Sequence, residues 1–230
     1  MEKRKWRFLA LMLAGVLLCG CASAPPASTE APETLPEETL EDFSMEDLQA
    51  FTGGNVEIRY SPETGLPKEI TGRFSPQQIL TAEDAIRSLG SVKTLFGIES
   101  LTFSCTEVEE RPDSRVFRLE QLWEGIPVSG YGFQVGAAND GTALFVSGNY
   151  CSAIQADLTG GLTEDACKEA LALSKGEKAA QARQTILTTQ DGAKLCWEFH
   201  IVAQDPLQER LVYCDASTGA ILKTIPLAMG

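Results

Sequence analysis

Apolar and polar residues alternate along most of the chain from residue 55 onward, a pattern typical of strands with one buried face. Three segments show helical spacing instead: Met45–Phe51, Ala82–Phe96 and Thr163–Ser174. Each segment begins at a side chain that can cap its first turn, and these side chains are Ser44, Thr81 and Thr163. The pattern therefore predicts three helices among the strands.

The alternating segments predict the strands Asn55–Tyr60, Lys68–Phe74, Leu101–Val108, Ser114–Trp123, Val128–Ala137, Thr142–Tyr150, Gln184–Thr189, Lys194–Val202, Glu209–Asp215 and Ile221–Ile225. In outline the order is helix, sheet, helix, sheet. This order predicts an α+β fold of two related modules, each a helix packed on an antiparallel sheet. We place the first module at residues 44–157 and the second at residues 158–230.

The first twenty residues are typical of an export signal rather than of a fold element. A basic segment, Lys3–Arg7, precedes the apolar run Phe8–Leu18, which is shorter than the ~20 residues of a membrane-spanning helix. The run ends in Leu-Cys-Gly-Cys, which resembles a bacterial lipobox. We predict a lipoprotein signal peptide at residues 1–20 and lipidation at Cys21, with an ordinary secretory signal as the alternative. The expected location is the cell membrane, lipid-anchored, on the extracytoplasmic side.

Residues 21–43 are rich in proline and in acidic side chains, and no Lys or Arg occurs between Arg7 and Arg59. Such a segment buries too little apolar surface to offset the entropy of ordering it. We predict a disordered acidic tether that holds the folded part away from the membrane. An acidic binding tail is the alternative.

The net negative charge limits the kinds of partner that we expect the chain to bind. The chain has 32 acidic and 19 basic residues and a formal charge of −13, while 43% of its residues are hydrophobic. Nucleic-acid phosphates are bound by Lys and Arg, so we expect no nucleic-acid partner. The membrane is expected as a partner only through the lipid anchor.

The short motifs of the common enzyme classes are absent. The sequence has no His-Glu-x-x-His, no Gly-x-Ser-x-Gly, no P-loop and no Gly-x-Gly-x-x-Gly after a strand. Its single histidine, His200, lies four positions after Cys196 on a strand, about 13 Å away and too far for both to bind one zinc ion. We expect no catalytic residue, no metal and no cofactor, and we interpret His200 as an exposed strand residue.

Five cysteines follow the signal segment: Cys105, Cys151, Cys167, Cys196 and Cys214. An odd number leaves at least one thiol without an intramolecular partner. Matching the apolar faces of the last two long strands places Trp197 opposite Tyr213. In that register Cys196 lies opposite Cys214, within disulfide range. We predict a disulfide between these two cysteines, with two free thiols as the alternative.

Residues 118–130 read Arg-Leu-Glu-Gln-Leu-Trp-Glu-Gly-Ile-Pro-Val-Ser-Gly, and an Asn-Asp-Gly turn and a Gly-Asn-Tyr ending follow. This stretch resembles the fungalysin/thermolysin propeptide (FTP) domain, although Ser129 stands where an aromatic residue is usual. The matching residues include Gln121, Gly125, Pro127 and Gly130. Gly125 and Pro127 bracket a tight turn, with proline at a strand start where no ladder donor is needed.

Residues 197–222 contain a strand, then Asp-Ala-Ser-Thr-Gly at 215–219, then an aliphatic strand. This arrangement resembles the PepSY-type half of the same propeptides. The side chain of Asp215 can accept hydrogen bonds from the turn backbone, and Gly219 can supply a positive φ. We interpret the residues matched in both stretches as structural.

In the family that these stretches resemble, the propeptide assists the folding of an attached metallopeptidase and inhibits it. Here the sequence ends at Gly230 without a peptidase domain. The resemblance implies a propeptide-like protein that binds or inhibits an exported metallopeptidase in trans. One alternative is a general cell-envelope module that binds peptides or other envelope components, and another is an enzyme with an unrecognised site. Pro226 is expected to end the last strand. The carboxy-terminal segment would then be either a tail that lies in a partner's substrate cleft or a frayed terminus.

Overall fold

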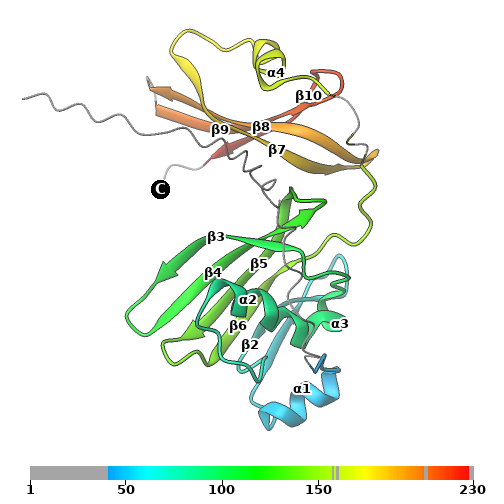
Figure 1. Ribbon diagram of the computed structural model, residues 1–230, viewed down its shortest axis with the longest axis vertical. Coiled ribbons are helices and arrows are strands. Elements are labelled where there is room, and N and C mark those ends of the chain that lie inside the picture. Colours follow the sequence, from blue (N-terminus) through cyan, green and yellow to red (C-terminus); the bar gives the residue numbers. More distant parts are fainter. Residues whose placement is uncertain (1–40, 157, 159–160, 205–206, 228–230) are drawn as a thin grey trace, which may run out of the picture. The chain divides into compact units, whose positions relative to one another are not determined.

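The computed structural model describes residues 41–156, 158, 161–204 and 207–227, and the fold is α+β, as the sequence predicted (Figure 1). The elements in chain order are α1 (Met45–Thr52), β1 (Glu57–Tyr60), β2 (Pro67–Thr71), α2 (Ala82–Ser88), η1 (Leu89–Val92), α3 (Lys93–Phe96), β3 (Phe103–Glu110), β4 (Ser114–Trp123), β5 (Ile126–Ala138), β6 (Ala143–Asn149), α4 (Glu164–Ala170), β7 (Glu177–Thr189), β8 (Gly192–Gln204), β9 (Leu207–Asp215) and β10 (Ile221–Leu227).

The first six strands form an antiparallel sheet in the order β1-β2-β6-β5-β4-β3, called the first sheet below. One face of this sheet is covered by the helical segments between β2 and β3, as Figure 1 shows for α2 and α3. Buried helical residues such as Leu89 and Phe96 share one hydrophobic cluster with Phe117, Phe133 and Val135 of the strands. The alternation of apolar residues along β4 and β5 therefore points one set of side chains into this core.

The last four strands form the second sheet, with the order β7-β8-β9-β10 and antiparallel pairing throughout. Helix α4 packs on one face through Cys167, which lies in a buried cluster with Phe199 and Val212. A single parallel pairing, Val128 to Ile186, joins β5 to β7 and so connects the two sheets. Both sheets thus carry helices on one face, as the sequence predicted.

The second predicted helix, Ala82–Phe96, is interrupted. Helix α2 ends at Ser88, a 3-10 turn follows as η1, and α3 adds a single further turn. The 3-10 segment contains Gly90, a poor helix former, and all four of its residues are buried. Packing therefore continues along the predicted apolar stripe, but the α-helical hydrogen bonding does not.

The fold begins before Ser44, so the predicted end of the tether at residue 43 is wrong. Phe43 is only 5% exposed, and its ring stacks on Phe51 with centroids 5.0 Å apart. Its position before the N-cap Ser44 is that of a hydrophobic staple. Asp42 accepts hydrogen bonds from the amide and hydroxyl of Thr94, at 3.0 and 2.6 Å. These contacts made by two residues of the acidic segment fasten the start of α1 to the helical layer.

The last strand continues through Pro226, where the sequence predicted its end. Pro226 pairs with Arg210 of β9, and Leu227 pairs with Glu209. The element order places β10 at the edge of the second sheet, and an edge strand tolerates a missing N–H. Residues 224–227 are therefore strand rather than tail, and residues 228–230 lie outside the described residues.

The predicted register between β8 and β9 is wrong by one residue. Cys196 pairs with Asp215 and Trp197 pairs with Cys214, so the two cysteines occupy opposite faces of the hairpin. Cys196 lies in a buried cluster with Tyr213, whereas Cys214 lies in the cluster under α4. None of the five cysteines of the described residues is bonded to another in the structure. The predicted disulfide between Cys196 and Cys214 is not formed, because a shift of one residue moves a strand's side chains to the other face.

Candidate functional site

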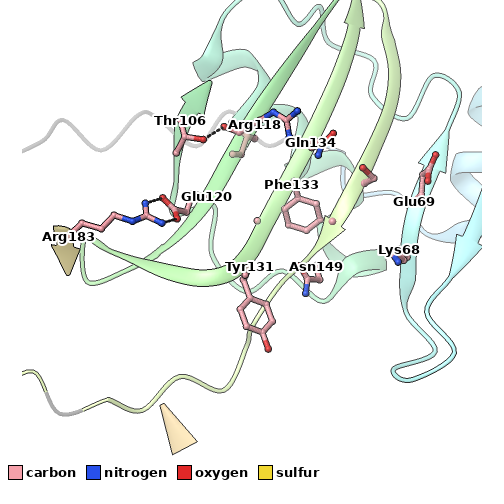
Figure 2. Close-up of a pocket in the computed structure, with 15 residues that line it drawn as sticks. Lys68, Glu69, Thr106, Arg118, Glu120, Tyr131, Phe133, Gln134, Asn149 and Arg183 are labelled. Carbon is pink, nitrogen blue, oxygen red and sulfur yellow. Dashed lines mark hydrogen bonds and ion pairs between the residues drawn. The ribbon is translucent and has the colours of Figure 1, made fainter. Parts of the chain in front are cut away.

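A groove crosses the face of the first sheet that the helices leave uncovered. It encloses about 540 Å³ and is lined by residues of β2, β3, β4, β5 and β6, with Arg183 of β7 at one end (Figure 2). Two cross-strand rows of side chains form its surface. One row is Glu120, Gly132 and Asn149, and the other is Arg118, Gln134, Ser147 and Glu69.

The hollow in this face comes from glycine in β5. Gly132 stands between Glu120 and Asn149, so the middle of that row has no side chain. A Cβ atom at Gly132 would collide with the carbonyl oxygen of Leu119, and φ there is 153°. Glycine is therefore required by the close approach of β4, and the gap in the polar face is a consequence of that backbone geometry.

The rim of the groove carries charges of both signs. Arg118 lies 2.9 Å from Glu107 and 3.8 Å from Glu109, which are carboxylates of the neighbouring strand β3. Glu69 pairs with Arg59 across the β1–β2 hairpin. Within the part of the chain that the structure describes, Lys68 makes no ion pair, so its exposed ammonium group is free to meet a carboxylate.

Arg183 links the two sheets at the end of the groove. Its guanidinium donates two hydrogen bonds of 2.9 Å to Glu120 of β4 and one of 2.8 Å to Glu198 of β8. Burial acts to lower the pKa of Arg183, but these hydrogen bonds outweigh it and raise the pKa above its ordinary value. The guanidinium therefore stays charged, and its planar fork fixes the orientation of the Glu120 carboxylate.

A second polar contact lies beside this ion-pair cluster. Ser129 of β5 donates a hydrogen bond of 2.9 Å to the phenol oxygen of Tyr213, which is 2% exposed. Burial raises the pKa of Tyr213 to about 12, and the nearby Glu198 also raises it. The phenol is therefore neutral at physiological pH and acts as a hydrogen-bonding group.

Three of the edge strands, β1, β3 and β10, are poorly suited to adding a strand from a partner. Strand β1 has four residues and an irregular register, and β3 has a register shift between Cys105 and Glu107 with three glutamates along its length. Strand β10 has a register shift after Ile221 and carries Pro226. Bulges, charges and proline are the features that protect edge strands from pairing. The uncovered face is therefore the better candidate for binding than these three edges.

Gln121, a residue of the FTP-like stretch, is 2% exposed and binds the backbone of Cys151 with both ends of its amide. Its Nε2 donates to the Cys151 carbonyl at 2.8 Å, and its Oε1 accepts from the Cys151 N–H at 2.9 Å. This pair of hydrogen bonds fastens the chain just after β6, where it leaves the first sheet. The side chain therefore holds the backbone and does not face the groove.

The glycines and Pro127 of the same stretch shape the start of β5. Gly125 takes φ 80° in the turn after β4, and Pro127 pairs with Leu122. Gly130 takes φ 81° where the β4–β5 register shifts, and this glycine also lines the groove. The register shift separates the hairpin end of β5 from the segment that forms the groove.

The turn between β9 and β10 has the geometry that the sequence predicted. One carboxylate oxygen of Asp215 accepts from the amides of Ser217 and Thr218, at 2.8 and 3.0 Å. Gly219 takes φ 75°. Burial acts to raise the pKa of Asp215, but these hydrogen bonds and Lys194 lower it overall. The carboxylate is therefore ionised above acidic pH and holds the turn closed.

His200 is half-buried rather than fully exposed, and its Nε2 lies 2.8 Å from a carboxylate oxygen of Glu209 on the next strand. Among the described residues, no group of three or more His, Cys, Asp and Glu side chains could hold a metal ion. None of the helices in that part of the chain is long and apolar enough to cross a membrane. Cys21 and the signal peptide lie outside the described residues, so lipidation stays a prediction.

The sequence predicted no groove, and Gly130, which lines it, was interpreted as a structural residue. Arg118, Glu120 and Gln134 come from strands that were predicted, but their common face could be inferred only from the pairing of β4 with β5 and β6. Arg183 was not singled out, because it stands 63 positions from Glu120 in the sequence. The alternation of charged residues with apolar ones along β4 is the one sequence signal that marks this face.

The chain is similar to the Bacillus megaterium YpeB C-terminal domain. The two share 15% identity with a TM-score of 0.41, and the match covers 82% of this chain and 100% of that chain. A likeness of this size carries no argument about function. No protein-family model matches the chain, and no curated protein matches it.

Proposed function

We propose that this protein is a lipid-anchored, extracytoplasmic binding protein that holds a segment of an exported metallopeptidase in the groove of the first sheet. The observation that carries the proposal is the uncovered, glycine-hollowed face of that sheet, described above. The FTP-like and PepSY-like stretches of the sequence support the choice of partner. Lys68 and the polar amides of Gln134 and Asn149 supply contacts for a polar segment that carries a carboxylate.

The groove favours binding over catalysis. Its charged side chains are mostly paired with one another, as Arg183 is with Glu120 and Arg118 is with Glu107. Paired charges position a ligand and give specificity, whereas an acid–base catalyst needs a titrating group in reach of a substrate.

The deciding experiment measures inhibition of an exported metallopeptidase by the purified protein. Gln134 is exposed in the middle of the groove, so Gln134→Trp should fill the hollow and weaken binding at least tenfold. The matched control is Thr224→Trp, an exposed strand position on the second sheet. Equal inhibition by both variants and the wild type would remove the groove from the mechanism.

The mixed charge of the rim also fits the second function, a general peptide-binding module of the cell envelope. A library of short acidic and neutral peptides, tested by fluorescence anisotropy against wild type and Gln134→Trp, distinguishes the two. Groove-dependent peptide binding without any effect on metallopeptidases would favour the general module. Binding that requires a folded metallopeptidase would favour the first function.

The lipid anchor is tested separately. Radiolabelled palmitate should enter the wild-type protein and not the Cys21→Ser variant, because Cys21 is the proposed acceptor. The Cys19→Ser variant is the control, since that residue would leave with the signal peptide. Equal labelling of wild type and Cys21→Ser would rule out this anchor without affecting the binding proposal.

A further inference from the structure

Two buried cysteines from different elements meet beneath helix α4. Cys167 belongs to α4 and Cys214 to the end of β9, and both are 0% exposed. They lie in one hydrophobic cluster with Phe199, Ile201 and Val212. The sulfur of Cys214 lies 3.9 Å from the carbonyl oxygen of Cys167, and the sulfur of Cys167 lies 3.9 Å from the carbonyl oxygen of Asp215, the residue after Cys214.

The remaining cysteines are excluded as partners by their positions. Cys196 lies on the opposite face of the β8–β9 hairpin, in the cluster with Leu187 and Tyr213. Cys105 and Cys151 pack against two other hydrophobic clusters, away from the one that contains Cys214. Cys167 is therefore the cysteine whose side chain faces Cys214.

We infer that Cys167 and Cys214 form a disulfide in the exported protein and that this bond fastens α4 to the second sheet. The bond forms by thiol–disulfide exchange with an oxidised dithiol oxidoreductase or a small-molecule disulfide. One thiolate attacks the donor disulfide and releases a thiolate, and the second cysteine then resolves the mixed disulfide. Two thiols lose two protons and two electrons, and the donor disulfide is reduced to two thiols.

A disulfide at this position would strengthen the attachment of α4 to the second sheet. Helix α4 has seven residues, and its hydrophobic contacts with the sheet come from few side chains, chiefly Cys167 and Leu171. The segment before it is held by a hydrogen bond of 2.9 Å from the indole of Trp197 to the carbonyl of Leu162. A covalent link in the middle of α4 would hold a short helix that cannot be stable alone.

The order of events follows from burial. Burial, and then the neighbouring Cys167 thiol, raises the pKa of Cys214 to about 12, so the reactive thiolate is scarce in the folded protein. The exchange should therefore occur during folding, before α4 covers the sheet. Once the reduced protein has folded, the same oxidant should act much more slowly.

The test is a peptide map of the full exported protein, alkylated without reduction and cut after glutamate. Such a digest separates the cysteines: Cys167 falls in residues 165–169, Cys214 in 210–230 and Cys196 in 178–198. We expect peptides 165–169 and 210–230 to be joined and to separate on reduction. Recovery of both as alkylated thiols, or a link from 210–230 to any other peptide, would overturn the inference.

Variants show whether the link holds the helix. Cys167→Ser should leave Cys214 as an alkylated thiol, whereas the control Cys196→Ser should leave the joined peptides unchanged. The thermal midpoint of the wild type should fall when reductant is present, and that of Cys167→Ser should not respond. If a variant fails to fold, the inference can still be tested, because the peptide map of the wild type alone shows whether Cys167 and Cys214 are joined.

Discussion

Replacing Gln121 should show how much one buried amide contributes to the junction between the two sheets. Gln121→Met keeps the length of the side chain and removes both hydrogen bonds to Cys151, at 2.8 and 2.9 Å. The backbone N–H and C=O of Cys151 would then face an apolar side chain. Because Cys151 is half-buried, water can satisfy these groups only in part.

The expected loss follows from these two contacts. A lost hydrogen bond costs about 1 kcal/mol net, and a stranded buried polar group costs about 1–3 kcal/mol. With partial access of water, two such groups give a total of about 2–4 kcal/mol. For a domain of about 150–250 residues, each kcal/mol lowers the melting temperature by about 2–4 °C, so a loss near 3 kcal/mol means about 6–12 °C.

Urea denaturation followed by tryptophan fluorescence measures this loss as a fall in the midpoint at unchanged slope. Gln134→Met on the exposed face of β5 is the matched control and should change the free energy of unfolding by less than about 0.5 kcal/mol. Gln121→Glu gives a second check. A buried carboxyl has a raised pKa, so its destabilisation is present at neutral pH and should shrink as the pH falls through that pKa. A loss below about 1 kcal/mol for Gln121→Met would refute the reasoning.

Three further outcomes are expected. Arg183→Met leaves Glu198, which is 8% exposed, without its cation. This variant should lower the free energy of unfolding by about 1–3 kcal/mol in urea denaturation, whereas the control Arg111→Met, at an exposed ion pair, should lower it by almost nothing. The pKa of Asp215 is lowered in the folded protein, so its carboxylate stabilises the fold above the unfolded pKa of about 3.9. This stabilisation is lost as the pH falls through the pKa of the folded protein. Asp215→Asn should therefore be less stable than wild type at pH 7 and equally stable in strong acid. Phe43→Ala should cost about 3 kcal/mol by thermal denaturation, and no change would mean that the tether extends to residue 43.

Local chemistry determined the parts of the fold that the sequence predicted well. Ser44 and Thr81 both form capping boxes, with side chains that bind the backbone three positions on. The turn at Asp215 also depends on groups two and three residues away. The strand β4 has the bounds that its alternation predicted. Such features can be predicted from the sequence because the interacting groups are neighbours in the chain.

The β8–β9 register was decided by tertiary structure. Both faces of this hairpin are buried, with Phe199 and Cys214 on one side and Cys196 and Tyr213 on the other. The alternation then no longer distinguishes an inner from an outer face, so matching apolar positions permits two registers. The packing of α4 on one face and the contact of Tyr213 with Ser129 on the other decide between them.

The sequence by itself determined the helix starts, most strands and the α+β class, because these depend on residues close together in the chain. Only the tertiary structure decided which side chains form the groove and which cysteine faces Cys214. Arg183 meets Glu120 across 63 positions, and Cys167 meets Cys214 across 47. Contacts at such separations depend on strand order and register, which no local pattern specifies.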